Sequence, residues 1–256
     1  MSGSLYETLR SYLKSLGSCA VAFSGGVDSS LVLFAASRAL PGRVIALTAR
    51  TLYTLPHEIE EGAAFAERLG VPHRIIDIPF PPEIRDNPRD RCYLCKRRIF
   101  TTFIEYARDA GYGSLVDGTN ADDEKEYRPG MRALAELGVA SPLRVCGITK
   151  QDVRELSKEL GLSTWDKPSY ACFLSRIPYG TRITEELVGR IREAEAFLKV
   201  KGFRDVRVRV HGELARIEVG REERKLFFDE TLLDEVSDAL KGLGFQHVTM
   251  ELSGYR

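Results

Sequence analysis

The sequence predicts an α/β fold with a doubly wound parallel sheet, followed by a smaller C-terminal α+β domain. Short apolar segments alternate with helical segments as far as about residue 160, which is typical of a parallel sheet with helices on both faces. Residues 206–210 and 214–219 instead alternate strictly between apolar and polar side chains, as antiparallel strands do. A loop rich in proline, glycine and serine separates the two patterns. We therefore expect domains at residues 1–174 and 175–256.

Four apolar segments are expected to form the parallel sheet. They lie at residues 19–23, 44–47, 74–78 and 115–118. Helices are expected near the N-terminus, where leucines recur at helical spacing, and at residues 31–36, 56–69, 93–110 and 150–160. Sheets of this kind bind ligands at the carboxyl ends of their strands. The segments that directly follow the strands are therefore candidate binding segments.

The C-terminal domain is expected to combine helices with a small sheet. Thr184 is the expected N-cap of a helix that runs to Lys201, and two glutamates follow it, as the helix dipole favours. The two alternating strands meet at His211-Gly212, and a helix at 232–243 and a strand at 247–252 complete the domain. The loop at residues 165–184 is expected to be ordered because it carries several aromatic side chains.

Composition excludes several classes of protein. Lysine plus arginine and aspartate plus glutamate number 37 each, so the zero net charge argues against a nucleic-acid partner. No apolar run is long enough to span a membrane, and the N-terminus does not have the pattern of a signal peptide, so we expect a cytoplasmic protein. An odd count of five cysteines argues against a disulfide framework. Cys19 is expected in the core, and Cys146 near a strand end without a role.

The most specific motif follows the first strand. It is Ser24-Gly25-Gly26-Val27-Asp28-Ser29-Ser30. Glycines let the backbone turn its N–H groups towards an anion, and the start of the next helix adds a partial positive charge. The string resembles the pyrophosphate loop of ATP pyrophosphatases and lacks the lysine of a Walker A loop. Asp28 is either an acidic residue that the helix dipole favours at this position or a ligand of a Mg²⁺ that bridges the phosphates.

Polar residues also follow two other strands. Arg50 ends the segment after the second strand, and Gly118, Thr119, Asn120 and Asp123 follow the fourth. Asparagine and aspartate at a strand end suit contacts with ribose or a metal, although an Asx-rich turn has the same composition. Arg128, a little further on, either clamps a phosphate or carboxylate or faces solvent.

Three cysteines stand apart from the core. Cys92 and Cys95 form a CxxC motif at the start of a helix, where the dipole and neighbouring basic residues are expected to lower the pKa of the thiols. Two thiolates make only half of a tetrahedral zinc site, so the pair is either incidental or part of a larger set. Cys172 lies in the 165–184 loop between Lys167 and Arg176, which favours a thiolate; a buried loop cysteine is the alternative.

Arginines gather on the predicted antiparallel strands. Arg207 and Arg209 share one face of their strand, and Arg216 lies on the next strand. A row of arginines is commonly a solvated face, but it also suits a phosphate or a subunit contact.

Taken together, these motifs resemble those of the LarE family over nearly the whole chain. They are SGGVDSS, RCYLCK, DGTNADDEKEYRPG, SPLR, KPSYACFLSRIPYGTRIT and VRVRVHGELARIEV. The resemblance implies a PP-loop ATP pyrophosphatase domain of the adenine nucleotide alpha hydrolase type. It also implies an ATP-dependent sulfurtransferase that makes thiocarboxylates from pyridinium-3,5-biscarboxylic acid mononucleotide. This reaction belongs to the synthesis of the nickel-pincer cofactor of lactate racemase.

The resemblance also implies roles for individual residues. ATP and Mg²⁺ would bind at the loop, and AMP transfer would turn a carboxylate into an acyl adenylate that a sulfur nucleophile attacks. In simpler members the residue matching Cys172 gives up its own sulfur and becomes dehydroalanine. In members with three cysteines, the residues matching Cys92, Cys95 and Cys172 hold a [4Fe-4S] cluster with one open iron. Both routes stay open, with the cluster favoured because a CxxC motif beside a third cysteine requires a reason.

Further residues are assigned by the same resemblance. Ser175 and Arg176 would lie near the transferred sulfur, Arg207 and Arg209 would bind the substrate phosphate, and Glu195 and Glu223 are additional substrate candidates. A homo-oligomer, a trimer or hexamer with C-terminal domains at its contacts, and a sulfide donor are the implied partners.

Other functions fit parts of the pattern. A [4Fe-4S]-dependent tRNA thiolase would use the same loop and cysteines but would normally carry a basic face. An amidotransferring synthetase would not need Cys172. A nucleotide-binding sulfur carrier without catalysis is the remaining alternative.

Overall fold

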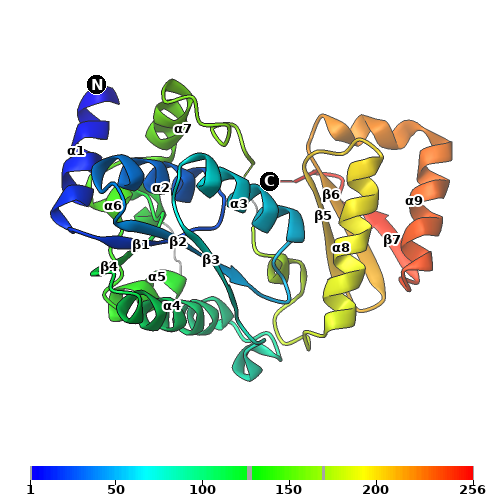
Figure 1. Cartoon of the computed structure of the whole chain (residues 1–256). Coiled ribbons are helices and arrows are strands. Elements are labelled where there is room, and N and C mark those ends of the chain that lie inside the picture. The colour runs from blue at the N-terminus through cyan, green and yellow to red at the C-terminus, as the bar shows by residue number, and fades with distance from the viewer. Residues whose placement is uncertain (1, 126–128, 169–170, 256) are drawn as a thin grey trace. The chain divides into compact units, whose positions relative to one another are not determined.

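The computed structural model describes residues 2–125, 129–168 and 171–255. The chain divides into two compact units (Figure 1). Unit 1 comprises residues 1–81 and 90–170, and unit 2 comprises residues 82–89 and 171–256. No pattern in the sequence indicates that residues 82–89 leave unit 1. Within the described part of the chain, no helix has the length and apolar character needed to cross a membrane.

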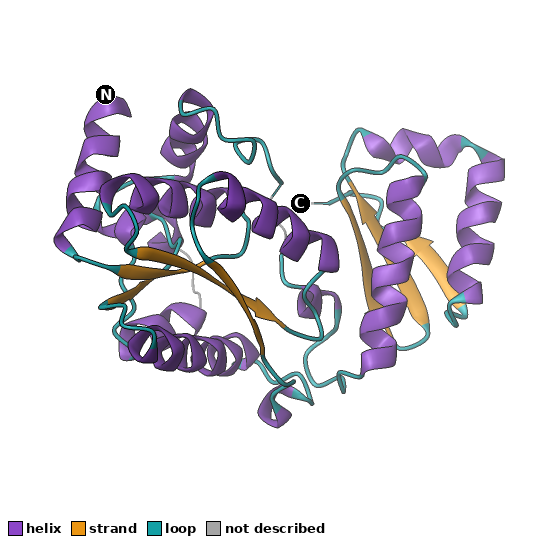
Figure 2. Cartoon of the chain, in the orientation of Figure 1, coloured by secondary structure: helices purple, strands orange, loops and turns teal. Residues whose placement is uncertain are grey.

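A four-stranded parallel sheet forms the centre of unit 1, as the sequence predicts (Figure 2). Its order is β3-β2-β1-β4, and the strands are β1 (Cys19–Ala22), β2 (Val44–Arg50), β3 (His73–Asp77) and β4 (Ser114–Val116). Cys19 of β1 pairs with Val44 on one side and with Ser114 on the other. The carboxyl ends of all four strands therefore lie at one edge, which we call the carboxyl edge.

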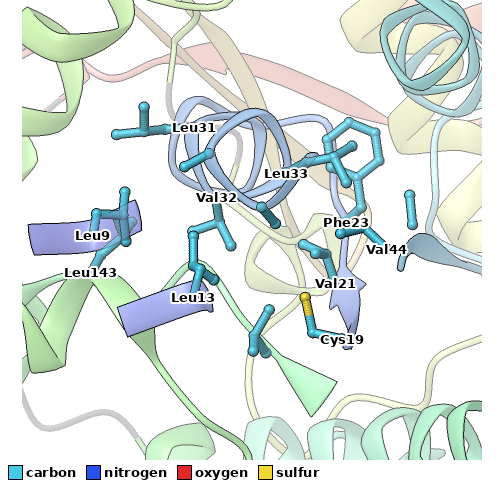
Figure 3. Close-up of a cluster of buried hydrophobic side chains, with 14 of the residues drawn as sticks. Leu9, Leu13, Cys19, Val21, Phe23, Leu31, Val32, Leu33, Val44 and Leu143 are labelled. Atoms are coloured by element: carbon cyan, nitrogen blue, oxygen red, sulfur yellow. The ribbon is translucent and has the colours of Figure 1, made fainter. Parts of the chain in front are cut away.

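Helices cover both faces of this sheet (Figure 1). The helices of unit 1 are α1 (Ser2–Ser15), α2 (Val27–Ala39), α3 (Pro56–Arg68), α4 (Arg91–Asp109), α5 (Pro129–Glu136), α6 (Pro142–Val145) and α7 (Lys150–Glu159). One core contains Cys19 and Val21 with side chains of α1, α2, α3, α6 and α7, and Figure 3 shows part of it. The opposite core contains Ala20 with side chains of α4 and α5. Neighbouring strand residues thus serve opposite faces, as a buried parallel sheet requires.

The structure differs from the sequence-based expectation in a few elements. Helices α5 and α6 and the 3-10 helix η2 (Ala121–Lys125) were not expected. Cys146, expected near a strand end, caps α6 instead. Because α6 spans only Pro142–Val145, it is too short to show a helical period in the sequence.

Unit 2 contains a small mixed sheet of order β5-β6-β7. Strands β5 (Val206–His211) and β6 (Leu214–Val219) are antiparallel, as predicted, whereas β7 (His247–Met250) runs parallel to β6. Helix α8 (Glu185–Val200) packs against β5 and α9 (Glu230–Gly242) against β7. The Thr184 side chain accepts the N–H of Leu187, which confirms the predicted N-cap. The 3-10 helices η1 (Pro82–Ile84), η3 (Phe173–Arg176) and η4 (Glu223–Phe228) complete the unit.

Residues 82–89 are built into unit 2 through Asn87. This residue is fully buried and adopts a φ of 50°, which asparagine tolerates better than most residues. Its side-chain amide donates to the carbonyls of Ile177 (2.9 Å) and Pro178 (2.7 Å), and its own carbonyl accepts the N–H of Gly180. These contacts order the second half of the 165–184 loop, in agreement with the sequence prediction.

Candidate active site

The Ser24–Ser30 loop connects β1 to α2 at the carboxyl edge. Gly25 has a φ of 71°, a left-handed conformation that favours glycine. Gly26 is the N-cap of α2 and offers no side chain to the free N–H groups of the first turn. The N-terminus of this 13-residue helix therefore has no side-chain cap, and its free N–H groups can bind an anion.

Hydroxyl groups hold the loop in this shape. Ser29 Oγ donates to the Gly26 carbonyl (3.2 Å) and lies 3.1 Å from Ser24 Oγ, which accepts the N–H of Gly26. The Oγ of Ser30 is buried and has no hydrogen-bond partner among the described residues. An unpartnered buried hydroxyl beside an uncapped helix end is consistent with a polar ligand at this loop.

Asp28 lies in the first turn of α2 between two polar groups from distant segments. The Asn120 side-chain amide donates to Asp28 Oδ1 (3.1 Å), and the Lys150 ammonium forms an ion pair with Oδ2. Lys150 is the first residue of α7, and its backbone N–H donates to the Asp122 carboxylate at 2.9 Å. A cation from α7 therefore stands beside the loop, although the loop itself contains no lysine.

The end of β4 presses directly against the start of α2. A Cβ atom built on Gly118 would lie 2.8 Å from the backbone nitrogen of Ser29, so no larger residue fits without displacing the helix. The neighbouring Asp117 is buried and accepts hydrogen bonds from the hydroxyls of Thr119 and Ser141. This close packing fixes the position of Asn120 relative to Asp28.

A second lysine contacts the other side of the loop. Lys167 Nζ donates to the Gly25 carbonyl (3.1 Å) and forms an ion pair with Glu61 of α3 (2.7 Å). Its side chain is 15% exposed. Gly25 is thus held by a charged hydrogen bond from a residue that lies far along the sequence.

The remaining cofactor candidates have other partners. Arg50, at the end of β2, donates to both oxygens of Asp77 (2.5 and 2.7 Å) on the surface, and this contact lowers the pKa of Asp77. Asp123 accepts the N–H of Asn120 (3.0 Å) and so closes a turn. Arg128 lies outside the described residues. Ser24, Gly25, Gly26, Val27, Asp28, Ser29, Ser30, Gly118, Thr119 and Asn120 are the candidates that the structure gathers at the loop.

Cys92 and Cys95 lie near the start of α4, three residues apart and hence on one side of the helix. Cys92 is exposed, and the sulfur of Cys95 lies 2.7 Å from the hydroxyl of Tyr53. The expectation of a lowered pKa is wrong for Cys95. Burial raises the pKa of this thiol, and the opposing effects of Tyr53 and Lys96 are smaller.

Cys172 belongs to unit 2, where it is exposed and precedes η3. Arg176 organises this turn: its guanidinium donates to the carbonyls of Ala171 (2.6 Å) and Cys172 (3.3 Å). The same guanidinium forms a buried ion pair with Glu195 of α8, at 2.9 and 3.2 Å. The Glu195 carboxylate also accepts the backbone N–H of Val208 on β5. Arg176 and Glu195 therefore tie the Cys172 turn to α8 and the sheet.

The arginines of β5 differ in their partners. Arg209 forms an ion pair with Glu218 of β6 (2.7 Å) and donates to the Ser175 carbonyl (2.8 Å). The guanidinium of Arg207 stacks on the ring of Tyr255 and has no hydrogen bond or ion pair with any described residue. Arg216 forms an ion pair with the same glutamate, Glu218, at 2.8 Å.

Glu223 does not join this group of contacts. Its carboxylate accepts the backbone N–H groups of Arg204 (2.6 Å), Asp205 (3.3 Å) and Gly220 (3.1 Å), which joins the segment before β5 to the turn after β6. The geometry gives Glu223 a structural function at this end of the small sheet.

The donor atoms at the loop suit Mg²⁺. The Asp28 carboxylate offers hard oxygen donors at the helix end, and Mg²⁺ is commonly bound by one or two carboxylates together with substrate phosphates. Across residues 2–125, 129–168 and 171–255, no three His, Cys, Asp or Glu side chains form a metal-binding group. Cys92 and Cys95 belong to unit 1 and Cys172 to unit 2, so the thiols of one unit do not complete a three-cysteine set.

Sequence reasoning overlooked Lys150, Tyr53 and Tyr255, and it considered Lys167 only as a neighbour of Cys172. The Thr149–Asp152 capping box is a sequence signal for the start of α7, and it could have drawn attention to Lys150 at that helix end. No local pattern identifies the other three, because their contacts join segments far apart in the chain.

Comparison with known proteins identifies the family. A profile of the NAD synthase family matches residues 2–168. The chain is 39% identical over 252 residues to an uncharacterized protein of Synechocystis sp., covering 98% of this chain and 94% of that protein. It is 37% identical over 253 residues to the pyridinium-3,5-bisthiocarboxylic acid mononucleotide synthase of Lactiplantibacillus plantarum, covering 97% and 91%. An uncharacterized protein of Methanocaldococcus jannaschii is 32% identical over 238 residues, covering 92% and 90%.

The two kinds of match correspond to the two units of the structure. The NAD synthase profile covers the parallel-sheet unit with its pyrophosphate loop, and the L. plantarum relative extends through the arginine-bearing sheet of unit 2. The chain therefore belongs to the LarE family of pyridinium-3,5-bisthiocarboxylic acid mononucleotide synthases, within the PP-loop ATP pyrophosphatase class.

Proposed function

We propose that this protein is an ATP-dependent sulfurtransferase that converts the carboxylates of pyridinium-3,5-biscarboxylic acid mononucleotide to thiocarboxylates. The observation that carries the proposal is the start of α2. Its first N–H groups have no side-chain cap, and Asp28 beside them contacts both Asn120 and Lys150. The L. plantarum relative is named for the bisthiocarboxylic product, and it covers nearly the whole chain.

Adenylation makes the substrate reactive. A carboxylate is a poor electrophile, so its oxygen attacks the α-phosphorus of ATP, pyrophosphate leaves, and an acyl adenylate with AMP as a leaving group results. The free N–H groups of α2 bind the β- and γ-phosphates, and Lys150 supplies the positive charge that a Walker A lysine supplies elsewhere. Asp28 would hold Mg²⁺, which supplies further positive charge to the phosphates when bound.

Pyrophosphate exchange tests this step. Wild-type protein should incorporate labelled pyrophosphate into ATP only in the presence of the pyridinium biscarboxylate, and Asp28→Ala should abolish the incorporation. Lys150→Met should slow it about 10- to 100-fold, because a charged contact to the phosphates is lost. Lys158→Met, on the exposed side of the same helix, is the matched control and should exchange normally. Exchange that needs no biscarboxylate, or none with this acceptor, would overturn the proposal.

Sulfur delivery is proposed to use Cys92, Cys95 and Cys172 as ligands of a [4Fe-4S] cluster. The CxxC pair on one side of α4 and the exposed Cys172 supply three thiols, and a cubane held by three thiolates leaves one iron for an additional sulfide. The Arg176 contacts to the carbonyls of Ala171 and Cys172 hold the backbone on either side of the Cys172 sulfur.

The competing route consumes the protein. The Cys172 thiolate would displace AMP to give a thioester, and loss of the Cα proton with cleavage of the Cβ–S bond would leave the thiocarboxylate and dehydroalanine. Replacing Cys92 with alanine distinguishes the routes. The cluster proposal expects loss of iron, acid-labile sulfide and sulfur transfer in anaerobically prepared protein. Full transfer by Cys92→Ala, with Cys172 losing the mass of H₂S, would support the sacrificial route instead.

Unit 2 is proposed to bind the substrate phosphate. Arg207 and Arg209 project from the same face of β5, while Ser175, Arg176 and Glu195 form the adjoining network. Of these, Arg207 is the group whose donors have no partner among the described residues, which makes it the principal phosphate ligand.

The wider role follows from the product. We place the reaction in the synthesis of the nickel-pincer cofactor of lactate racemase, in the cytoplasm, with a sulfide donor that replenishes the cluster. A homo-trimer or hexamer is the proposed assembly, and light scattering of the purified protein tests it.

A further inference from the structure

Three arginines of unit 2 are held in two different ways. Arg176 and Arg209 use the N–H edges of their guanidinium groups to bind Glu195, Glu218 and backbone carbonyls. Arg207 is held by its face, because its Cζ atom lies 3.9 Å from the centroid of the Tyr255 ring. A stacked guanidinium keeps all of its N–H donors in the plane, where they are available to an oxyanion.

The segment that carries Tyr255 is firmly attached to the sheet. The backbone N–H of Tyr255 donates to the carbonyl of Val219 at the end of β6 (2.7 Å). Gly254 makes this return possible: its φ is 72°, and a Cβ atom there would lie 3.0 Å from the same carbonyl. Arg224 donates to the carbonyls of Arg221 and Leu252 and so fixes the turn. The ring therefore lies in a fixed position beside β5.

The electrostatics of Arg207 also favour an anionic ligand. Its pKa lies below the ordinary value, first because of burial and then because Arg176 and Arg209 repel the charge. The neighbouring carboxylates of Glu195 and Glu218 are already paired with Arg176, Arg209 and Arg216. A cation in this position gains more from an arriving phosphate than a solvated surface arginine does.

We propose that Tyr255 is a positioning residue that presents the N–H edge of Arg207 to the phosphate of the substrate mononucleotide. This inference rests on the proposed function and adds a residue to it. Tyr255 acts through its aromatic face, so the ring matters and the hydroxyl does not.

Binding of pyridinium-3,5-biscarboxylic acid mononucleotide to the full-length protein, measured by titration calorimetry, tests the inference. Tyr255→Phe keeps the ring and should bind within about twofold of wild type. Tyr255→Leu keeps apolar bulk without a π face and should raise Kd about fivefold to thirtyfold. In an Arg207→Gln background, Tyr255→Leu should cause no further change, because the group that it positions is absent.

The outcomes separate this inference from the proposed function. If Arg207→Gln leaves Kd unchanged, the phosphate contact of the proposed function is wrong. If Arg207→Gln weakens binding but Tyr255→Leu does not, only the positioning role is overturned. Phe228→Leu, which alters an 88% exposed aromatic side chain of the same unit, should bind normally. Thermal unfolding is recorded for each variant, and Tyr255→Met provides the same comparison if the leucine variant unfolds.

Discussion

The carboxyl edge of unit 1 and the arginine-bearing sheet of unit 2 concentrate polar groups by different means. At the carboxyl edge, loops and helix starts bring together Asp28, Asn120 and Lys150, and α2 keeps its N–H groups uncapped. On the small sheet, alternate strand residues project away from the core, and the charges of Arg209 and Arg216 are neutralised by the buried carboxylate of Glu218.

This difference determines what each region can do. A helix end with unsatisfied N–H groups binds an anion through the backbone, so its function depends on close packing of main chain. In a buried set of paired charges, the pairs form a scaffold, and only a group left without an ionic partner is available to a ligand. Asp28 and Lys150 are partly exposed and can exchange partners, whereas Arg176 and Glu195 are too deeply buried to do so easily.

The largest expected effect tests the scaffold of unit 2. Arg176→Met removes one partner of an ion pair whose side chains are only 3% and 5% exposed. Glu195 is then left as a buried unpaired charge, so the free energy of unfolding should fall by about 3–5 kcal/mol. Urea denaturation measures the change.

A second substitution shows whether the buried charge is the cause. Adding Glu195→Gln to Arg176→Met should recover part of the stability, because the neutral amide oxygen still accepts the N–H of Val208. Wild-type stability of Arg176→Met alone would mean that this network is open to water, and the contrast between the two regions would then disappear.

The next effect tests the packing at the carboxyl edge. Gly118→Ala places a Cβ atom 2.8 Å from the backbone nitrogen of Ser29, so the start of α2 must move. We expect a loss of about 1–3 kcal/mol in the free energy of unfolding and a larger proportional loss of pyrophosphate exchange. Gly113→Ala is the control, since the nearest atom to its Cβ atom would be the Ser18 hydroxyl oxygen, at 3.4 Å. Equal exchange by both variants would contradict a role for this close approach.

Much of unit 1 could be predicted from the sequence, because its signals are local. The apolar strand before SGGVDSS and the helix after it specify a loop at the carboxyl edge, and topology alone then brings residues 118–120 to the same edge. The alternation of β5 and β6 likewise predicted their antiparallel pairing and the shared face of Arg207 and Arg209.

The residues that could not be predicted from the sequence depend on contacts between distant segments. Lys150 lies 122 positions from Asp28, and nothing in the sequence around a lysine at a helix start indicates so distant an ion-pair partner. The same holds for Tyr255, whose partner Arg207 lies on another element. Burial also reversed one inference: local charges around Cys95 suggested a lowered pKa, but removal of the thiol from water outweighs them.

The smallest expected effect concerns the Cys95 thiol. It tests whether a neighbouring side chain shifts the pKa of a group in unit 1, as burial and neighbouring charges together shift the pKa of Arg207 in unit 2. Burial raises the pKa of Cys95, and the Tyr53 hydroxyl opposes the rise by donating to the thiolate. Tyr53→Phe removes this donor, so the pKa rises further and less thiolate is present at pH 8. Iodoacetamide should then modify Cys95 about twofold to tenfold more slowly.

Mass spectrometry of individual peptides follows each cysteine in the same sample. Cys146, whose pKa is also raised by burial, has no contact with Tyr53 among the described residues and should react at an unchanged rate. The wild-type rate at Cys95 should increase with pH beyond the range of an ordinary cysteine, because its thiolate forms later. Faster modification in Tyr53→Phe would mean that the tyrosine shields the sulfur rather than stabilising its charge, and tuning by a neighbouring donor would then be restricted to unit 2.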